Sequence, residues 1–204
     1  YEIHERLVGS EMCIRDSAIT FKETFPLIKD NKMWLGYSIH SGDREFQVPD
    51  EYPLTAAGWR IDDNGRKFIR VKGVRWFTNI DHGRRHEPLP LMTMADNLRF
   101  SKHKELKGKT AYDRYDNYDA IEVPFTDAIP SDYDGVMGVP ISFLDKYCPE
   151  QFEILGISLE LGIKKPDNLP KEKQGGPAFY IKMGTDYNRM YCRLAIRRKL
   201  TIDN

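Results

Sequence analysis

Apolar and polar residues alternate most regularly near the C-terminus, and this period of two predicts a β-strand over residues 189–198. One face of that strand would carry Met190, Cys192, Leu194 and Ile196. The other face would carry Tyr191, Arg193, Ala195 and Arg197. The preceding run AFYIKM (178–183), joined to it by GTDYN, would be its antiparallel partner in a hairpin.

The segment RKFIRVKGVRWFTNI (66–80) predicts a second hairpin. Two runs rich in β-branched and aromatic residues are separated by Lys72-Gly73, and glycine supplies the positive φ that a tight turn requires. One face of this hairpin would carry Ile69, Val71, Val74, Trp76 and Ile80.

Helical spacing is confined to short segments. Phe21, Phe25 and Ile28 recur at helical intervals after a possible capping box, but Pro26 requires the helix either to begin later, with Thr24 as its cap, or to kink. The run KMWLGYS (32–38) predicts a short strand. PISFLDKYC (140–148) predicts a short helix capped by Ser142, followed by a strand from about Phe152.

The segment LVGSEMCIRDS (7–17) follows neither period. Back-translated, it resembles a transposase-type adapter used for sequencing libraries, and YEIHER (1–6) fits the same origin. We therefore expect residues 1–17 to be a non-native, adapter-derived segment. The natural protein would then enter near Ala18, with its upstream part missing.

Composition excludes several classes of protein. No run approaches the roughly 20 apolar residues of a membrane helix, so we expect no membrane association and a cytoplasmic location. Beyond the adapter-like segment only Cys148 and Cys192 remain, which favours reduced thiols over a disulfide framework or a cysteine-based zinc site. The residues from 18 onward suffice for one domain with a real core.

Charge is balanced overall, with 31 basic and 31 acidic residues, but it is unevenly distributed. Eight cations lie between 75 and 109: Arg75, Arg84, Arg85, Arg99, Lys102, Lys104, Lys107 and Lys109. Five more, and no acid, lie between 189 and 199. Such clusters suit phosphate contacts, and arginines can also read guanine edges. The alternative is a solvated basic face that pairs with the chain's own acidic segment, and composition favours neither.

That acidic segment, residues 112–135, holds seven carboxylates against Arg114 alone: Asp113, Asp116, Asp119, Glu122, Asp127, Asp132 and Asp134. Clustered carboxylates could bind a hard cation, but their spacing is not that of an EF-hand and favours a solvated or arginine-paired surface. His82 and His86 have metal-ligand spacing for a helix, although Gly83 and Pro88 indicate a loop. No Gly-rich phosphate loop and no G-x-S-x-G elbow occur.

Three stretches carry a resemblance to a known family: AITFKETFPLIKDNKMWLG (18–36), VRWFTNIDHGRRHEPL (74–89) and the long block from YDNYDAIEVPF to QFEILG (115–156). Together they resemble the EcoRI-type adenine-specific DNA methyltransferases. The resemblance runs through nearly all of residues 18–164 and again near the C-terminus.

This resemblance implies methyl transfer from S-adenosylmethionine to the N6 of adenine in double-stranded DNA, in a restriction-modification setting of a prokaryotic cell or phage that could include a cognate endonuclease. It implies an α/β fold, a partial Rossmann-like sheet ending in an antiparallel hairpin, with a loop-rich, β-containing DNA-recognition region. The family's glycine-containing cofactor motif and its Asn-Pro-Pro-Phe/Tyr tetrapeptide, which binds the flipped adenine, are both absent from these 204 residues. No catalytic or cofactor-binding residue can therefore be carried over.

We accordingly interpret the chain as a C-terminal part of such an enzyme, inactive alone. Residues 18–80 would form the end of the methyltransferase sheet and residues 81–204 a DNA-recognition region packed on it within one domain. The expected DNA contacts are Arg84, Arg85, Lys102, Lys104 and Lys107, with Arg193 and Arg197 as weaker candidates. The alternatives are a stand-alone DNA-binding or regulatory module of a restriction-type or mobile-element system, and a metal-dependent nuclease using Asp132 and Asp134.

Overall fold

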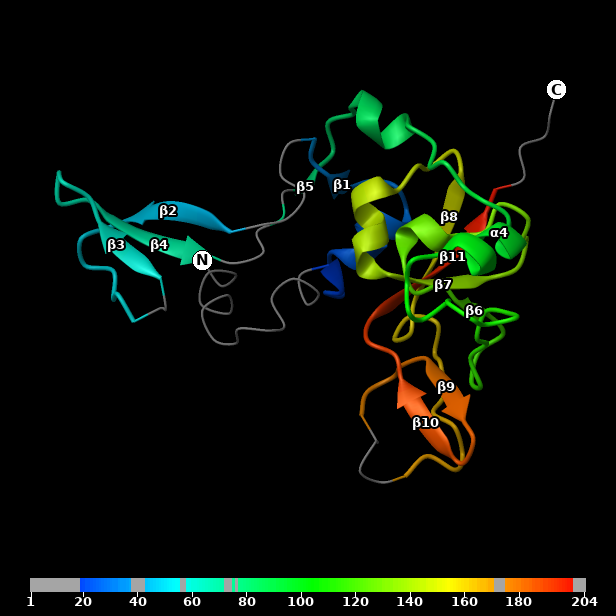
Figure 1. The fold of residues 1–204 in the computed structure, drawn as a ribbon. Coiled ribbons are helices and arrows are strands. Elements are labelled where there is room, and N and C mark those ends of the chain that lie inside the picture. Colours follow the sequence, from blue (N-terminus) through cyan, green and yellow to red (C-terminus); the bar gives the residue numbers. More distant parts are fainter. Residues whose placement is uncertain are drawn as a thin grey trace. The chain divides into compact units, whose positions relative to one another are not determined.

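The chain folds into two compact units, which meet in sequence between Ile80 and Asp81. A computed structural model (Figure 1) describes residues 19–37, 43–55, 58–71, 75, 77–170 and 175–199. The expected adapter-derived segment, residues 1–17, lies outside them. Within the described residues the chain is α/β, with mixed sheets and few helices. None of the helices described is both long and apolar enough to cross a membrane.

In the first unit, proline sets the start of one short helix. Helix α3, Phe25–Lys29, places Pro26 in its first turn, where the missing N–H breaks no helical bond. The helix therefore begins after Thr24 and does not kink, which agrees with the first of the two predicted alternatives, although the Thr24 side chain makes no capping hydrogen bond. Strand β1, Trp34–Leu35, confirms the strand expected there, and it pairs antiparallel with β5, Phe77–Thr78.

A three-stranded antiparallel sheet forms the rest of the first unit that the structure describes. Its order is β2 (Arg44–Val48), β4 (Lys67–Val71) and β3 (Trp59–Ile61). The turn between β3 and β4 is built on Asp62, whose carboxylate accepts hydrogen bonds from the backbone N–H groups of Asn64 (3.0 Å) and Arg66 (2.9 Å). Gly65 adopts φ 77° there, a left-handed conformation that favours glycine.

The predicted hairpin over residues 66–80 is therefore wrong. Strand β4 pairs with β2 and β3, whereas β5 pairs with β1. The turn that β4 uses is Asn64-Gly65, on the N-terminal side of the run, because the Asp62 carboxylate organises it. Lys72-Gly73, the predicted turn, lies outside the described residues.

The second unit is built on a mixed four-stranded sheet, in the order β6-β7-β11-β8. Strands β6 (Ile121–Glu122) and β7 (Met137–Pro140) are parallel, and β11 (Arg193–Arg198) lies antiparallel between β7 and β8 (Phe152–Ile157). Three successive side chains of β11 are fully buried, those of Leu194, Ala195 and Ile196. This central strand is thus covered on both faces, although its sequence alternates.

The predicted C-terminal hairpin is right in its first strand and wrong in its partner. Strand β9 (Tyr180–Met183) pairs with β10 (Asp186–Arg189) across a tight turn at Gly184, where φ is 63°. Most of the expected loop GTDYN is therefore strand. The alternating run that follows joins the four-stranded sheet because Leu194 and Ile196 are buried there.

Between β7 and β8 the chain forms a 3₁₀ helix, η3, Ile141–Lys146. Its N-cap is Pro140 and no side chain caps it, so the predicted cap at Ser142 is wrong. The start of β8 at Phe152 agrees with the strand expected there.

One buried ion pair crosses the sheet of the second unit. Glu122 on β6 is 4% exposed and accepts hydrogen bonds from the Arg193 guanidinium of β11 at 2.8 Å and 3.0 Å. The hydroxyl of buried Tyr115 also donates to Glu122, and this environment raises the pKa of Tyr115 well above its ordinary value, through burial first and then the carboxylate charge. The tyrosine ring fills the space that a side chain would need at Gly138, on the intervening strand β7.

Arg193→Ala should lower the free energy of unfolding by about 3 kcal/mol, because it leaves the Glu122 carboxylate buried without its counter-ion. Urea unfolding would measure the loss. Arg197→Ala removes an exposed arginine from the same strand and should cost under about 0.5 kcal/mol. Equal losses in the two variants would contradict a structural role for the ion pair.

Candidate nucleic-acid interface

The cations of the second unit are positioned by a short helix and the loop after it. Helix α4, Met94–Phe100, is capped by Thr93, whose hydroxyl oxygen accepts from the Asp96 N–H at 3.1 Å. Asn97, 1% exposed, donates its amide N–H groups to the carbonyl oxygens of Met92 (3.4 Å) and Ala128 (3.3 Å). These bonds fix α4 against the acidic segment.

The segment that follows, residues 101–110, is called the basic loop below. Its turn is closed by the His103 carbonyl oxygen, which accepts from the N–H groups of Leu106 (3.2 Å) and Lys107 (3.0 Å). Leu106 is 2% exposed, and the His103 ring stacks on Phe125 with centroids 3.6 Å apart. An Nε2 contact of 3.0 Å joins His103 to Asp127. The side chains of Leu106 and His103 thus hold the loop against the rest of the unit.

Three lysines of the basic loop face solvent: Lys102, Lys104 and Lys107. Across the part of the chain that the structure describes, no ion pair engages any of them. Lys109, by contrast, pairs with Asp113 of the acidic segment. Pairing with the chain's own carboxylates therefore accounts for Lys109 and His103 but leaves these three charges unneutralised.

Most carboxylates of the acidic segment contact other groups of the protein. Besides its contacts to the basic loop, Asp119 pairs with Arg114, Asp134 lies 3.8 Å from Arg198, and Asp132 accepts from the Met94 N–H at 2.7 Å. Among the described residues, no group of three or more His, Cys, Asp or Glu side chains could hold a metal ion. The arginine-paired interpretation of this segment is thus the one its contacts support.

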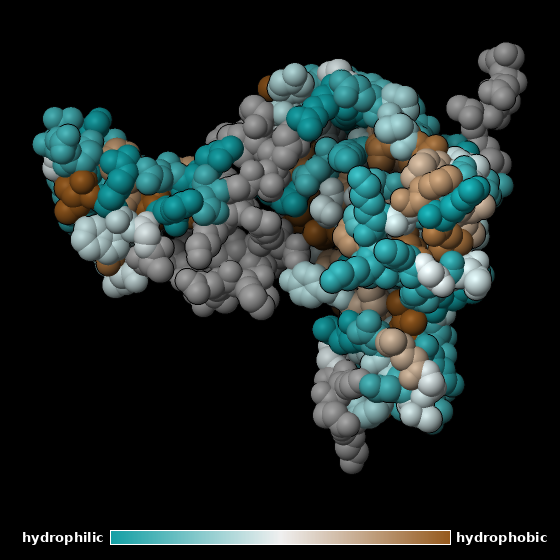
Figure 2. All heavy atoms as spheres, in the orientation of Figure 1, coloured by the Kyte–Doolittle hydropathy of each residue, from teal (hydrophilic) through white to brown (hydrophobic). Residues whose placement is uncertain are grey.

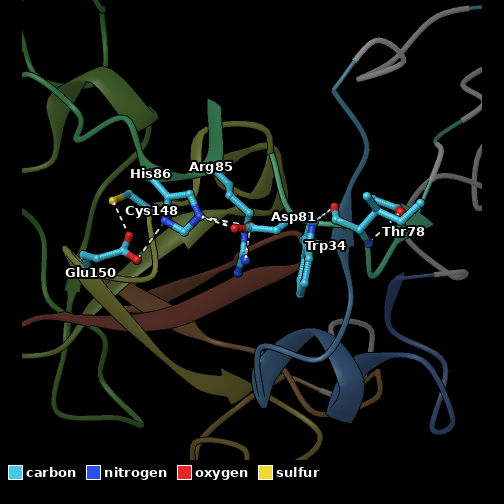
Figure 3. Close-up of polar contacts among 8 residues, drawn as sticks. Trp34, Thr78, Asp81, Arg85, His86, Cys148 and Glu150 are labelled. Carbon is cyan, nitrogen blue, oxygen red and sulfur yellow. Dashed lines mark hydrogen bonds and ion pairs between the residues drawn. The ribbon is translucent and has the colours of Figure 1, made fainter. Parts of the chain in front are cut away.

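A polar network holds Arg85, one of the two adjacent arginines that were predicted to contact DNA (Figure 3). Both arginines lie in the 3₁₀ helix η1, Gly83–His86. The His86 ring joins two carboxylates, with Nε2 2.9 Å from Asp81 and Nδ1 2.9 Å from Glu150. Arg85 donates to Asp81 at 2.8 Å, and its side chain is only 9% exposed. The network therefore commits Arg85 to the protein and fixes the turn on which Arg84 is exposed.

The same turn is held at two further points. Leu89 and Gln151 exchange two hydrogen bonds, from the Leu89 N–H to the amide oxygen at 2.8 Å and from the amide nitrogen to the Leu89 carbonyl at 3.0 Å. The Cys148 thiol is 1% exposed and donates to Glu150 at 3.3 Å, and burial raises the pKa of this thiol.

The structure separates the seven predicted contacts into two groups. Five are exposed: Arg84, Lys102, Lys104, Lys107 and Arg197. Arg85 and Arg193 instead hold Asp81 and Glu122. Sequence reasoning missed the anchors His103, Leu106 and Asn97, although an apolar residue and a histidine within a lysine-rich loop could have indicated the first two.

Two glycines of the second unit, Gly135 and Gly138 in the segment GVMGVP, do not form an open cofactor loop. A Cβ at Gly135 would collide with the ring of Tyr133, and one at Gly138 with the ring of Tyr115, so protein fills both places. Neither glycine offers the open backbone that a glycine-rich cofactor loop needs.

Comparison with known proteins gives a consistent result. Residues 11–199 match the family model described as adenine-specific methyltransferase EcoRI. The Type II methyltransferase M.EcoRI of Escherichia coli is 44% identical over 151 residues, which are 74% of this chain and 43% of that protein. M.MgeORF184P of Mycoplasma genitalium is 34% identical over 142 residues, 69% of this chain and 41% of the relative. The chain thus spans less than half the length of these relatives, and no solved structure matches it.

The network around His86 predicts a pH dependence of stability. Hydrogen bonds to Asp81 and then Glu150 raise the pKa of His86 above its ordinary 6.5, so its stabilisation is complete below pH 6.5 and is lost as pH rises through the higher folded pKa. Arg85 and His86 lower the pKa of Asp81 to about 2, so the Asp81 contribution is present above pH 3.8 and is lost as pH falls toward 2.

Urea midpoints of the wild-type chain and a His86→Gln variant, measured from pH 6 to pH 9, test the histidine contribution. The two curves should be furthest apart at the acid end and converge as pH rises. A constant separation would show that the charge on His86 contributes nothing.

Proposed function

The chain belongs to the EcoRI family of adenine-specific methyltransferases, and we propose that it is a C-terminal part of a site-specific DNA adenine-N6 methyltransferase of a restriction-modification system. S-adenosylmethionine is the proposed methyl donor and double-stranded DNA the substrate. A cognate endonuclease would then act on the same DNA site.

The exposed lysines of the basic loop are the observation that supports DNA contact most strongly. Lys102, Lys104 and Lys107 lie on a loop whose turn is fixed by buried Leu106 and stacked His103. A loop whose turn is already fixed can present its lysines to phosphates without first being ordered, and phosphate contacts set the register of a protein on a duplex. Arg84 on η1 and Arg197 on β11 are further proposed contacts.

Catalysis is assigned to no described residue. Adenine N6 lies within the duplex, so such enzymes extrude the base into a pocket. The Asn-Pro-Pro tetrapeptide that would hold it does not occur in this sequence, and tyrosine rings fill the space beside Gly135 and Gly138. We therefore propose DNA recognition as the role of residues 81–204. For residues 18–80 we propose the end of a Rossmann-like sheet.

Replacing Lys102, Lys104 and Lys107 together by alanine should weaken duplex binding and flatten its salt dependence. Each lost phosphate contact removes about 0.9 from the slope of log K against log salt, so three contacts predict a slope shallower by roughly 2 to 3. Fluorescence anisotropy with a labelled duplex at several salt concentrations would measure both quantities.

A charge-matched control comes from Lys164, Lys165 and Lys182, which are also exposed. Alanine at these three positions removes the same net charge elsewhere in the second unit. If the two triple variants lost equal affinity and slope, general charge and not the basic loop would determine binding.

The transfer reaction requires a separate test. The complete enzyme, supplied with methyl-labelled S-adenosylmethionine and plasmid DNA, should place the label on N6 of adenine, as mass spectrometry of the nucleosides would show. Label on cytosine would contradict the proposed reaction.

A further inference from the structure

The three-stranded sheet of the first unit has two faces of different character. Directly paired residues of antiparallel strands point to the same face, so Phe46, Ile69 and Trp59 form one cross-strand row. By the same register one face carries eight side chains: Arg44, Phe46, Val48, Trp59, Ile61, Lys67, Ile69 and Val71. We call it the aromatic face. The other face carries Glu45, Gln47, Arg60, Phe68 and Arg70.

The charges of the other face are satisfied within the unit. Arg60 pairs with Glu45 at 2.8 Å and lies 4.3 Å from the centre of the Phe68 ring. Arg70 pairs with Asp43 at 3.0 Å. This face is therefore a solvated, internally paired surface.

The aromatic face differs because several of its large apolar side chains are exposed to solvent. Ile69 at its centre is 4% exposed, whereas Phe46 is 40%, Trp59 50% and Ile61 50% exposed. In Figure 2, hydrophobic residues interrupt the hydrophilic surface over these strands. Aromatic residues thus flank a buried centre and leave part of their own surface accessible.

The charge of the aromatic face has one sign. It carries the cations Arg44 and Lys67 and no carboxylate. Each cation donates to a backbone carbonyl, Arg44 to Asp43 and Lys67 to Asp50, and within the described residues neither enters an ion pair. An occupant that combines flat apolar groups with negative charge would match this face.

We propose that the aromatic face binds unpaired nucleotides of a DNA strand, with bases stacked on Trp59 and Phe46 and phosphates near Arg44 and Lys67. The inference rests on the proposed DNA substrate and extends it to a second contact surface. Stacking needs bases that are out of the duplex stack, and single-stranded DNA offers such bases directly. An apolar protein partner would use the aromatic residues but would gain nothing from two unpaired cations.

The spacing of the two rings suits two bases of one strand. Phe46 and Trp59 lie two strands apart, a separation of about 10 Å between their backbones. Ile69 between them keeps the row continuous and apolar. A single strand crossing the sheet could therefore place two bases, with one nucleotide between them, on the two rings.

The test is the affinity of the whole chain for a short, labelled, mixed-sequence single strand, compared with its duplex. Trp59→Ala should weaken binding of the single strand about tenfold, the size typical of one stacked base. Trp59→Phe should retain most of the affinity, which separates loss of stacking from loss of folding. Arg44→Gln should reduce the salt slope by about the amount of one phosphate contact.

Gln47→Ala is the matched control, because Gln47 is exposed on the same sheet but on the opposite face. Unchanged single-strand affinity in Trp59→Ala would overturn the inference, as would dimers in sedimentation that Trp59→Ala dissociates. The basic-loop triple variant separates the two proposals. If it loses duplex binding while Trp59→Ala loses nothing, only the aromatic face is excluded.

Discussion

The ion pair between Glu122 and Arg193 is the constraint on which the second unit depends. A carboxylate that is 4% exposed is tolerated only with its counter-ion and hydrogen-bond donors in place. Arg193 and Tyr115 supply both. Because Glu122 lies on β6 and Arg193 on β11, the pair joins the two strands across β7. It therefore anchors the acidic segment to the centre of the sheet.

That anchoring explains how acidic and basic segments can coexist in a nearly neutral chain. The acidic segment contacts the basic loop at two points, Asp127 at His103 and Asp113 at Lys109, and fixes the loop in place. Ion pairs at such exposed positions add little stability, so their main effect is on the placement of charge. The lysines further out remain solvated, which leaves a local positive charge on a protein with no net charge.

Local signals in the sequence were sufficient for several elements. Pro26 determines where α3 begins, and the strand from Phe152 follows a proline that ends the preceding segment. The lysines of the basic loop are exposed, as expected for a segment rich in charged residues. The pairing of strands was not predictable in the same way, because hydrogen-bond partners lie far apart in sequence. The Asn64-Gly65 turn was a usable signal that competed with a second glycine in the same run.

The sequence also did not indicate which arginines pair with carboxylates of the protein itself. Arg193 alternates with apolar residues as an exposed strand residue would, and only its partner, 71 residues earlier, shows that its side chain turns toward the protein. Arg85 is adjacent to Arg84, but the Asp81 carboxylate turns it inward. A sequence shows how many cations a segment holds, whereas the contacts decide which of them can reach a phosphate.

Hydrogen–deuterium exchange of the chain, with and without duplex DNA, tests the central claim most directly. The account predicts slower exchange of backbone amides in the basic loop and in η1, with the β9–β10 hairpin unchanged. Protection confined to other parts of the chain, with the basic loop exchanging at the same rate in both states, would contradict it.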